Sequence, residues 1–249
     1  MEVSLKDRVA LVTGGTRGIG AAIVEQFAAS GAKVVTNYRN QEQAEKFQAE
    51  MKQKGYDTHI YQADVSDFEA CKKLSADIEK DVGPLDILVN NAGVTQDTTL
   101  RKMSKEQWDT VMRINLDSVY NVSRNVIEGM LERGYGRIIN ISSVNGQKGQ
   151  LGQSNYAASK AGMHGFTMSL AQETARKGIT VNTVSPGYIG TDMVMQVPDD
   201  VREKIITQIP VARLGKPEEV AELVTFVASD KAGFITGSDI SANGGQHMM

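Results

Sequence analysis

Short apolar runs alternate with longer segments of helical periodicity along most of this chain, and this alternation restricts its fold more than any other feature. The runs occupy residues 9–12, 33–36, 58–61, 87–89, 137–141 and 180–184, and the helical patterns occupy 17–30, 41–54, 67–82, 104–132 and 155–177. Strands separated by helices of this length pair as parallel neighbours through crossover connections. Because the runs are almost continuously apolar, helices are expected to cover both faces of the sheet. The sequence therefore predicts an α/β fold with a doubly wound parallel sheet.

Residues 1–249 are expected to form a single domain, because no repeat, low-complexity segment or linker interrupts the pattern. The net charge of −3 gives no reason to expect nucleic acid or an anionic membrane as a partner. No apolar run approaches the length of a membrane span, and the N-terminal residues lack the apolar core of a signal peptide. A single cysteine, Cys71, suits a reducing compartment, so we expect a cytoplasmic protein. The scattered His59, His164 and His247 have no ligand spacing, which predicts no metal site.

A glycine-rich turn joins the first apolar run to the first helical pattern. Its sequence is Thr13-Gly14-Gly15-Thr16-Arg17-Gly18-Ile19-Gly20. Strand, glycine turn and helix in this order are typical of a dinucleotide site, because glycines let the backbone approach a pyrophosphate, whose charge a helix N-terminus favours. The alternative is a tight turn that uses glycine for its conformation alone. The length of the match and its context favour a dinucleotide site in a Rossmann-type sheet.

A tyrosine and a lysine stand four residues apart in the last helical pattern, and a serine precedes them. The three residues are Ser143, Tyr156 and Lys160. A spacing of four places two side chains on one helical face, where an ammonium group is expected to lower the pKa of a neighbouring phenol from its ordinary value of about 10. Such a phenol is a candidate general acid, and the serine hydroxyl can hold the oxygen that is protonated. A chance pairing on an exposed helix is the alternative, and the upstream glycine turn favours the chemical role.

Together these segments resemble the single-domain short-chain dehydrogenase/reductase family over nearly the whole chain. The matching segments are residues 13–20, Asp64-Val65, Asn90-Asn91-Ala92-Gly93, Asn115, Ser143, Tyr156, Lys160, Pro186-Gly187 and Thr191. The resemblance implies a Rossmann-type oxidoreductase in which Asn115, Ser143, Tyr156 and Lys160 form the catalytic proton relay. It also implies a cofactor site made by Gly14, Thr16, Arg17, Gly18, Ile19, Gly20, Tyr38, Arg39, Asp64, Val65, Asn91, Ala92, Gly93, Tyr156, Lys160, Pro186, Gly187, Ile189 and Thr191. In that site Asp64 would receive the adenine amino group; its simpler alternative is to cap the turn before Ser66.

The choice of cofactor is argued from charge at the end of the second strand. A carboxylate there would bind the two ribose hydroxyls and repel a 2′-phosphate. The position falls near Tyr38, which is not acidic, and Arg39 follows it. Arg17 lies in the glycine turn on the same side, and two guanidinium groups can clamp a phosphate. We therefore expect NADPH as the cofactor, with Arg39 as a solvated helix-start residue as the alternative.

The substrate is expected from resemblance to one group within the family. Residues 142–150, 183–189 and 243–248 resemble the acetoacetyl-CoA reductases of polyhydroxyalkanoate synthesis, although Leu151 replaces the aromatic residue expected there. By their position after the sixth strand, residues 188–210 are expected to form a lid, with a surface excursion as the alternative. The resemblance implies reduction of acetoacetyl-CoA to (R)-3-hydroxybutyryl-CoA, with Ser143, Gln150, Gln153, Tyr156 and Tyr188 at the substrate; ordinary loop positions are the alternative for the two glutamines. It also implies a homotetramer. The alternatives are 3-oxoacyl-(acyl-carrier-protein) reductase, which needs a basic docking face, and a non-catalytic nucleotide-binding scaffold.

Overall fold

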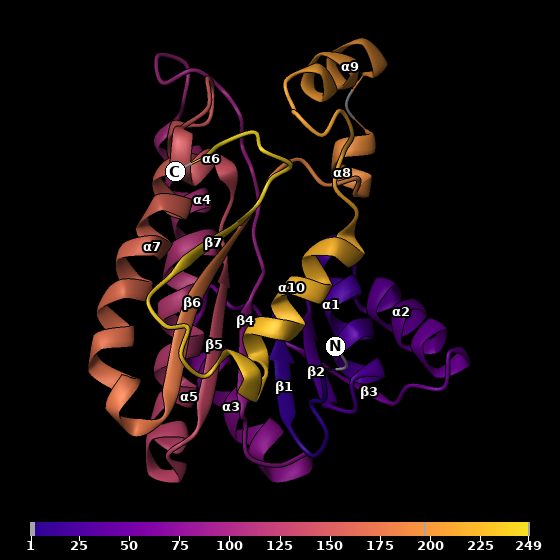
Figure 1. Cartoon of the computed structure of the whole chain (residues 1–249), viewed down its shortest axis with the longest axis vertical. Helices are drawn as coiled ribbons and strands as arrows, with labels where there is room; N and C mark the ends of the chain where they lie inside the picture. Colours follow the sequence, from indigo (N-terminus) through magenta and orange to yellow (C-terminus); the bar gives the residue numbers. More distant parts are fainter. Residues whose placement is uncertain (1–2, 197, 249) are drawn as a thin grey trace.

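One parallel sheet of seven strands organises the computed structural model, which describes residues 3–196 and 198–248. The strand order is β3-β2-β1-β4-β5-β6-β7, and every pair is parallel (Figure 1). The strands are β1 (Val9–Val12), β2 (Lys33–Tyr38), β3 (Thr58–Gln62), β4 (Ile87–Asn90), β5 (Gly136–Ile141), β6 (Ile179–Pro186) and β7 (Asp239–Ala242). This confirms the predicted doubly wound α/β fold. Each predicted run lies within one of the first six strands.

Ten α-helices connect the strands within the described residues. They are α1 (Gly18–Ala29), α2 (Gln41–Gln53), α3 (Phe68–Asp81), α4 (Lys105–Met112), α5 (Ser118–Arg133), α6 (Val144–Lys148), α7 (Ser154–Thr174), α8 (Asp192–Met195), α9 (Asp199–Thr207) and α10 (Pro217–Ala228). Local signals set several of the starts. Asn40 and Asp67 accept the third backbone N–H of α2 and α3, and Ser104 and Gln107 form a reciprocal capping box at α4.

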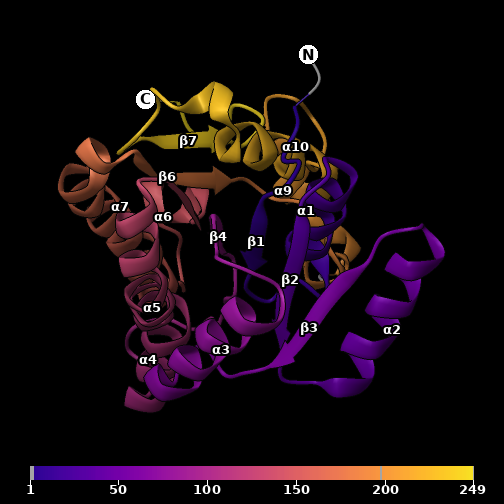
Figure 2. The ribbon, with the colours of Figure 1, turned by 90° about the horizontal axis from the view of Figure 1, so that it is seen from below.

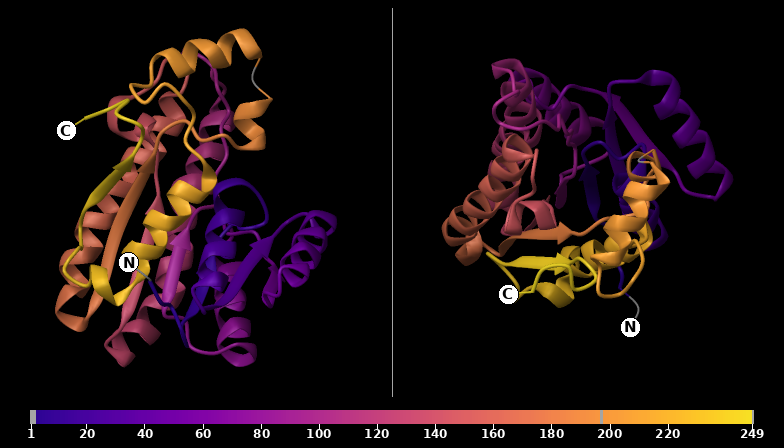
Figure 3. Two further views of the ribbon diagram at one scale, coloured as in Figure 1. Left: turned by 45° about the vertical axis from the view of Figure 1, so that its right-hand side comes forward. Right: turned by 90° about the horizontal axis from the view of Figure 1, so that it is seen from above.

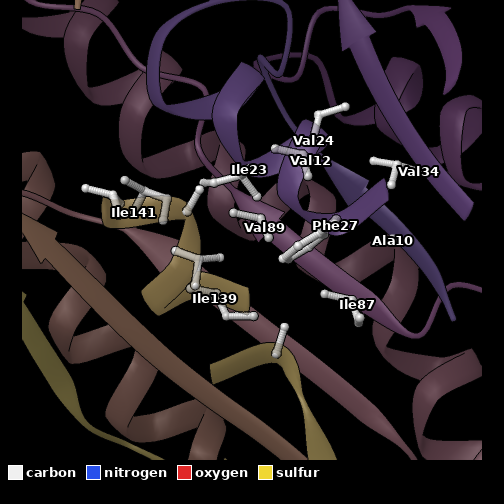
Figure 4. Packing of buried hydrophobic residues seen from close by; sticks show 14 of the residues in the cluster. Ala10, Val12, Ile23, Val24, Phe27, Val34, Ile87, Val89, Ile139 and Ile141 are labelled. Carbon is white, nitrogen blue, oxygen red and sulfur yellow. The ribbon is translucent and has the colours of Figure 1, made fainter. Parts of the chain in front are cut away.

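The two faces of the sheet follow from the alternation of side chains along each strand. In β1, Ala10 and Val12 pack against α1 and α10, whereas Val9 and Leu11 pack against α3 and α5. Figure 2 shows α1 and α10 on one side of the sheet and α3 and α5 on the other. Figure 4 shows Phe27 of α1 packed among side chains of the central strands. Both layers exclude water from the centre of the sheet, which explains why the central strands β1 and β4 are almost entirely apolar.

The C-terminal part of the fold was not predicted. The seventh strand, β7, has the half-polar sequence Asp-Ile-Ser-Ala and joins the edge of the sheet beside β6. Its strand character comes from pairing with β6 and not from an apolar run. Helix α10 does carry a local start signal in the sequence. Pro217 begins it, Glu218 and Glu219 occupy its first turn, and its buried stripe packs against α1.

The long pattern predicted at 104–132 is not one helix. A π-helical turn, Arg113–Asp117, separates α4 from α5. The buried side chain of Asn115 lies in this turn, where it bonds the backbone of a neighbouring loop and not its own helix. Such single π-turns often accompany functional sites. Local preferences in the sequence could not reveal the break, because the partner of Asn115, Val94, is 21 residues away in the chain.

Loops at the carboxyl ends of the strands enclose the region of interest. The chain leaves β1 and β4 towards opposite sides of the sheet, which creates a crevice between their carboxyl ends. Figures 1 and 3 show α8 and α9 standing beyond these ends. They belong to the predicted lid, residues 188–210, of which Val197 lies outside the described residues. No helix in residues 3–196 and 198–248 is both long and apolar enough to cross a membrane.

Candidate active site

A cavity of about 580 Å³ opens at the carboxyl edge of the sheet. Its walls are the glycine turn, the ends of β2 and β3, and the loops after β4, β5 and β6. Predicted site residues on these walls are Gly14, Thr16, Arg17, Gly18, Ile19, Gly20, Arg39, Asp64, Val65, Asn91, Ala92, Gly93, Ser143, Tyr156, Lys160, Pro186, Gly187 and Thr191. Two predicted cofactor residues lie elsewhere. Tyr38 is half-buried in β2 without lining the cavity, and the buried Ile189 lines a second cavity of about 360 Å³.

The glycine turn is held tightly against the loop that follows β4. Gly14 has a φ of 63°, a conformation that glycine adopts at little cost. A Cβ atom on Gly20 would stand 2.5 Å from the side-chain nitrogen of Asn91 and 2.6 Å from the carbonyl oxygen of Gly14. Asn91 donates hydrogen bonds to the carbonyl oxygens of Thr13 and Gly14 at 2.9 and 3.2 Å. The turn thus presents bare backbone, with no Cβ in the way, at the start of α1.

Sequence analysis missed a buried asparagine that also fixes this turn. The side-chain oxygen of Asn37 accepts a hydrogen bond from the Gly14 N–H at 3.1 Å, and its amide donates to the Ala63 carbonyl at 2.9 Å. Asn37 lines the cavity, as do Asn40 and Gln43. An asparagine directly after the apolar run of this strand was a signal that could have found it. Asp64 caps the turn by accepting the Ser66 N–H, as its simpler alternative predicted, and still lines the cavity.

Three side chains that can take part in proton transfer meet at the other end of the cavity. The Lys160 ammonium lies 5.6 Å from the centre of the Tyr156 ring, so the spacing of four does place both on one face of α7. The Ser143 hydroxyl, at the end of β5, hydrogen-bonds the Tyr156 hydroxyl. Lys160 is only 3 % exposed, and its Nζ donates to the Ile141 carbonyl at 2.7 Å. This geometry brings together three of the four residues predicted for the relay.

The pKa values in this group differ from the expectation. Burial raises the pKa of Tyr156 to about 12, while the hydrogen bond from Ser143 opposes that rise. Burial also lowers the pKa of Lys160 to about 7. The spacing had predicted a lowered phenol pKa, but burial is the largest influence on this phenol and outweighs the hydrogen bond from Ser143. At neutral pH the phenol therefore keeps its proton, which is the form required of a general acid.

Asn115, the fourth relay residue, lies behind the cavity and not on its wall. Its side-chain oxygen accepts the Val94 N–H at 2.8 Å, and its amide donates to the Val94 carbonyl at 3.0 Å and to Ser159 Oγ at 3.2 Å. A Cβ on Gly93 would lie 3.4 Å from the Asn115 side-chain oxygen and 3.5 Å from the Lys160 Nζ. Asn115 therefore stands beside the lysine and ties α4 and α5 to the loop after β4.

The residues predicted to bind substrate are only partly brought together. Gln150 is exposed and accepts a hydrogen bond from Lys148, and Leu151 is exposed beside it. Gln153 is engaged at both ends of its amide, since it donates to Asp97 at 2.7 Å and accepts from Asn145 at 2.9 Å. Tyr188 lines the second cavity but lies near enough to Tyr156 to raise its pKa. Ser143 and Tyr156 are thus the predicted substrate residues that line the main cavity.

Comparisons with known proteins identify the family of the chain. Residues 8–202 match the family model described as short chain dehydrogenase. The chain is 58% identical over 242 residues to an acetoacetyl-CoA reductase of Rhizobium meliloti, covering 96% of this chain and 98% of the relative. It is 56% identical over 241 residues to the acetoacetyl-CoA reductase of Shinella zoogloeoides, with the same coverage. It is 44% identical over 244 residues to a 3-oxoacyl-(acyl-carrier-protein) reductase, FabG, of Haemophilus influenzae, covering 98% and 100%. The chain therefore belongs to the short-chain dehydrogenase family of oxidoreductases.

Proposed function

We propose that this protein reduces a short β-ketoacyl thioester with NADPH, converting acetoacetyl-CoA to (R)-3-hydroxybutyryl-CoA. The observation that carries the proposal is one cavity that has a glycine cradle at one end and Ser143, Tyr156 and Lys160 at the other. The names of the relatives at 56 and 58% identity support acetoacetyl-CoA as the substrate. In this role the product would serve polyhydroxybutyrate biosynthesis in the cytoplasm.

The residues at the cradle suit a dinucleotide. No side chain caps the N-terminus of α1, so its first N–H groups can receive a pyrophosphate. Arg17 and Arg39 are exposed on the same wall, and the cavity residues after β2 are Arg39, Asn40 and Gln43, with no carboxylate among them. Two guanidinium groups, with no carboxylate at the end of β2, favour a 2′-phosphate, and hence NADPH.

The chain's own groups then act on the substrate carbonyl. The bound nicotinamide would supply the hydride. Ser143 donates a hydrogen bond to the carbonyl oxygen as negative charge grows there, and Tyr156 transfers its phenolic proton to the same oxygen. Lys160 faces the phenol. In its protonated form, Lys160 stabilises the phenolate that remains after Tyr156 has given up its proton. Asn115, beside Lys160, orients the loop that holds this end of the cavity and would hold a water molecule that supplies a proton to the lysine.

Two further parts of the proposal concern access and assembly. Residues 188–210 act as a lid, since Thr191, Asp192 and Gln196 already line the cavity. Helices α8 and α9 stand beyond the carboxyl ends of the strands (Figure 3). The protein forms a homotetramer. Exposed aromatic side chains of α3 and α5, Phe68 and Tyr120, stack with ring centres 6.1 Å apart and offer a surface for a second copy.

Steady-state kinetics test the proposed function directly. Acetoacetyl-CoA and an acetoacetyl acyl carrier protein should be compared side by side, with NADPH oxidation as the measurement. We expect a higher kcat/KM for the CoA thioester. A clear preference for the carrier protein would favour the 3-oxoacyl-(acyl-carrier-protein) reductase activity, which the FabG relatives support. Absence of NADPH oxidation with both thioesters would favour a non-catalytic role.

A further inference from the structure

A third side chain on the catalytic helix takes part in a buried polar network behind the site. His164 lies one turn beyond Lys160 on α7, so that residues 156, 160 and 164 form a continuous stripe. Its Nε2 lies 2.9 Å from Ser142 Oγ and 3.4 Å from the Asp239 carboxylate of β7. The side chains of His164 and Asp239 are 19 and 18 % exposed. The contact joins positions 75 residues apart, which sequence spacing could not reveal.

The direction of the hydrogen bonds follows from what each group can donate. The Lys160 carbonyl oxygen, 3.0 Å from Ser142 Oγ, can only accept, so the Ser142 hydroxyl donates to it. Ser142 has no second hydrogen to offer. Its oxygen must therefore accept a hydrogen from Nε2 of His164. This assigns the tautomer of His164 in which Nε2 carries the proton.

Asp239 anchors the far side of the network. Its two oxygens accept hydrogen bonds from Ser185 Oγ at 2.6 Å and from the Gln147 side chain at 2.8 Å. Gln147 belongs to α6, and Ser185 to β6. The carboxylate thus links the edge strand β7 to three neighbouring elements, and it faces the proton-bearing nitrogen of His164. A partly buried carboxylate accepts a stronger hydrogen bond from an N–H group than a neutral acceptor does.

The network ends on the segment that carries the Ser143 hydroxyl. Ile141 accepts from the Lys160 Nζ, and Ser142 is held by Val184 through its backbone N–H at 2.8 Å as well as by His164. Ser143 follows directly, caps α6 and hydrogen-bonds the Tyr156 hydroxyl. Since the turnover of an enzyme is sensitive to small displacements of its reacting groups, restraint of Ser142 matters for Ser143.

We propose that His164 and Asp239 are positioning residues, which hold Ser142 so that the Ser143 hydroxyl stays in place against Tyr156 and the substrate oxygen. The proposal rests on the proposed function, because it concerns the same reaction. It differs from a purely structural role in one respect. A residue that acts through the Ser143 hydroxyl has nothing left to position once that hydroxyl is removed.

A double-mutant cycle between His164 and Ser143 tests this with acetoacetyl-CoA and NADPH. His164→Leu removes the donor and is expected to lower kcat roughly 10- to 100-fold, the range found for groups that orient reacting residues, with little change in KM. His164→Gln keeps an amide donor at a similar position and should restore kcat to within about threefold of the wild type. In the Ser143→Ala background, His164→Leu should lower kcat by no more than about twofold.

Controls separate positioning from loss of structure. Glu173→Gln changes an exposed residue on the same helix and should leave kcat unchanged. NADPH affinity, measured by fluorescence titration, should be kept in each variant. Three outcomes would each overturn the proposal. The first is a wild-type kcat in His164→Leu, and the second is an equal loss of kcat in His164→Gln and His164→Leu. The third is additive losses of kcat in the double-mutant cycle. If His164→Leu does not fold, Asp239→Asn takes its place in the same cycle, with the same outcomes. An inactive wild type would contradict the proposed function itself.

Discussion

Tyr156 is the residue on which the proposed chemistry depends most directly. Burial raises its pKa to about 12, so it holds a proton at neutral pH. Tyr156→Phe deletes that proton and leaves the ring. We expect kcat for ketone reduction to fall by about 10²- to 10⁴-fold, the usual contribution of a general acid, while NADPH still binds. Stopped-flow turnover and NADPH fluorescence measure the two effects, and near-normal turnover would remove Tyr156 as the acid.

Lys160 makes a separate prediction about stability and pH. Its pKa falls from 10.5 to about 7 on burial, so between these values the unfolded chain binds more protons than the folded one. The free energy of unfolding contributed by this residue therefore rises with pH across that window. Lys160→Met, which carries no titrating group, should flatten the rise while abolishing turnover. Urea unfolding between pH 7 and pH 9 measures this slope. The range stops at pH 9 because Cys71, whose pKa is raised from 9.0 to about 12, opposes the trend at higher pH. Equal slopes in both proteins would contradict the lowered pKa of Lys160.

Arg39 decides the cofactor in the proposal. Arg39→Asp places a carboxylate at the end of β2, where it would bind ribose hydroxyls and repel a 2′-phosphate. We expect kcat/KM for NADPH to fall roughly 10- to 100-fold, as for loss of a charged hydrogen bond, and that for NADH to rise. Lys46→Asp on the exposed side of α2 makes the same change in charge outside the cavity. If kcat/KM for NADPH falls as much in Lys46→Asp, the effect comes from the electrostatic field of the whole protein. It would then not come from a contact between Arg39 and the cofactor.

The glycine turn is the element whose geometry can be tested with least change. Gly20→Ala places a Cβ 2.5 Å from the Asn91 amide and 2.6 Å from the Gly14 carbonyl, so both must move. We expect weaker NADPH binding and a loss of about 1–3 kcal/mol in unfolding free energy, as for an overpacked site. Gly165→Ala on α7, where a Cβ meets nothing within 4 Å, is the matched control and should stabilise the helix by up to ~1 kcal/mol. Calorimetry and fluorescence titration measure both variants, and tight NADPH binding by Gly20→Ala would contradict the cradle.

The helix that was predicted at 104–132 shows why elements can differ from their local pattern. Its periodicity is continuous, yet Asn115 bonds both backbone groups of Val94 and a π-turn forms around it. The energy of those two hydrogen bonds to buried groups exceeds the small preference for regular helix at one residue. Edge strand β7 is the opposite case, since pairing with β6 makes a strand from a sequence with little strand character.

Across the whole molecule, assembly is the property that the exposed surface predicts. Tyr120 of α5 is 53 % exposed and stacks on Phe68, and Phe166 of α7 lies beside them. Tyr120→Asp should weaken association, because a charge is costly in a buried interface. Light scattering after size-exclusion chromatography is expected to show a tetramer for the wild type and smaller species for the variant. A monomeric wild type would contradict the proposed homotetramer.

The sequence by itself determined the parallel sheet, the glycine turn and the shared face of Tyr156 and Lys160. Each depends on a short-range rule: apolar runs of strand length, glycine at a strand–helix junction, and a spacing of four on a helix. Because such rules need only neighbouring residues, they can be applied before any fold is known. The cavity lined by Gly14, Gly20 and Tyr156 followed once the sheet order brought those segments together.

The tertiary structure alone decided the electrostatics and the long-range contacts. The raised pKa of Tyr156 and the lowered pKa of Lys160 come from burial, which depends on everything that packs around them. The π-turn at Asn115, the two-sided binding of Gln153 and the His164–Asp239 pair each join residues that are distant in the chain. Desolvation and distant hydrogen bonds have no signature in local spacing, and so they appear only when the chain is folded.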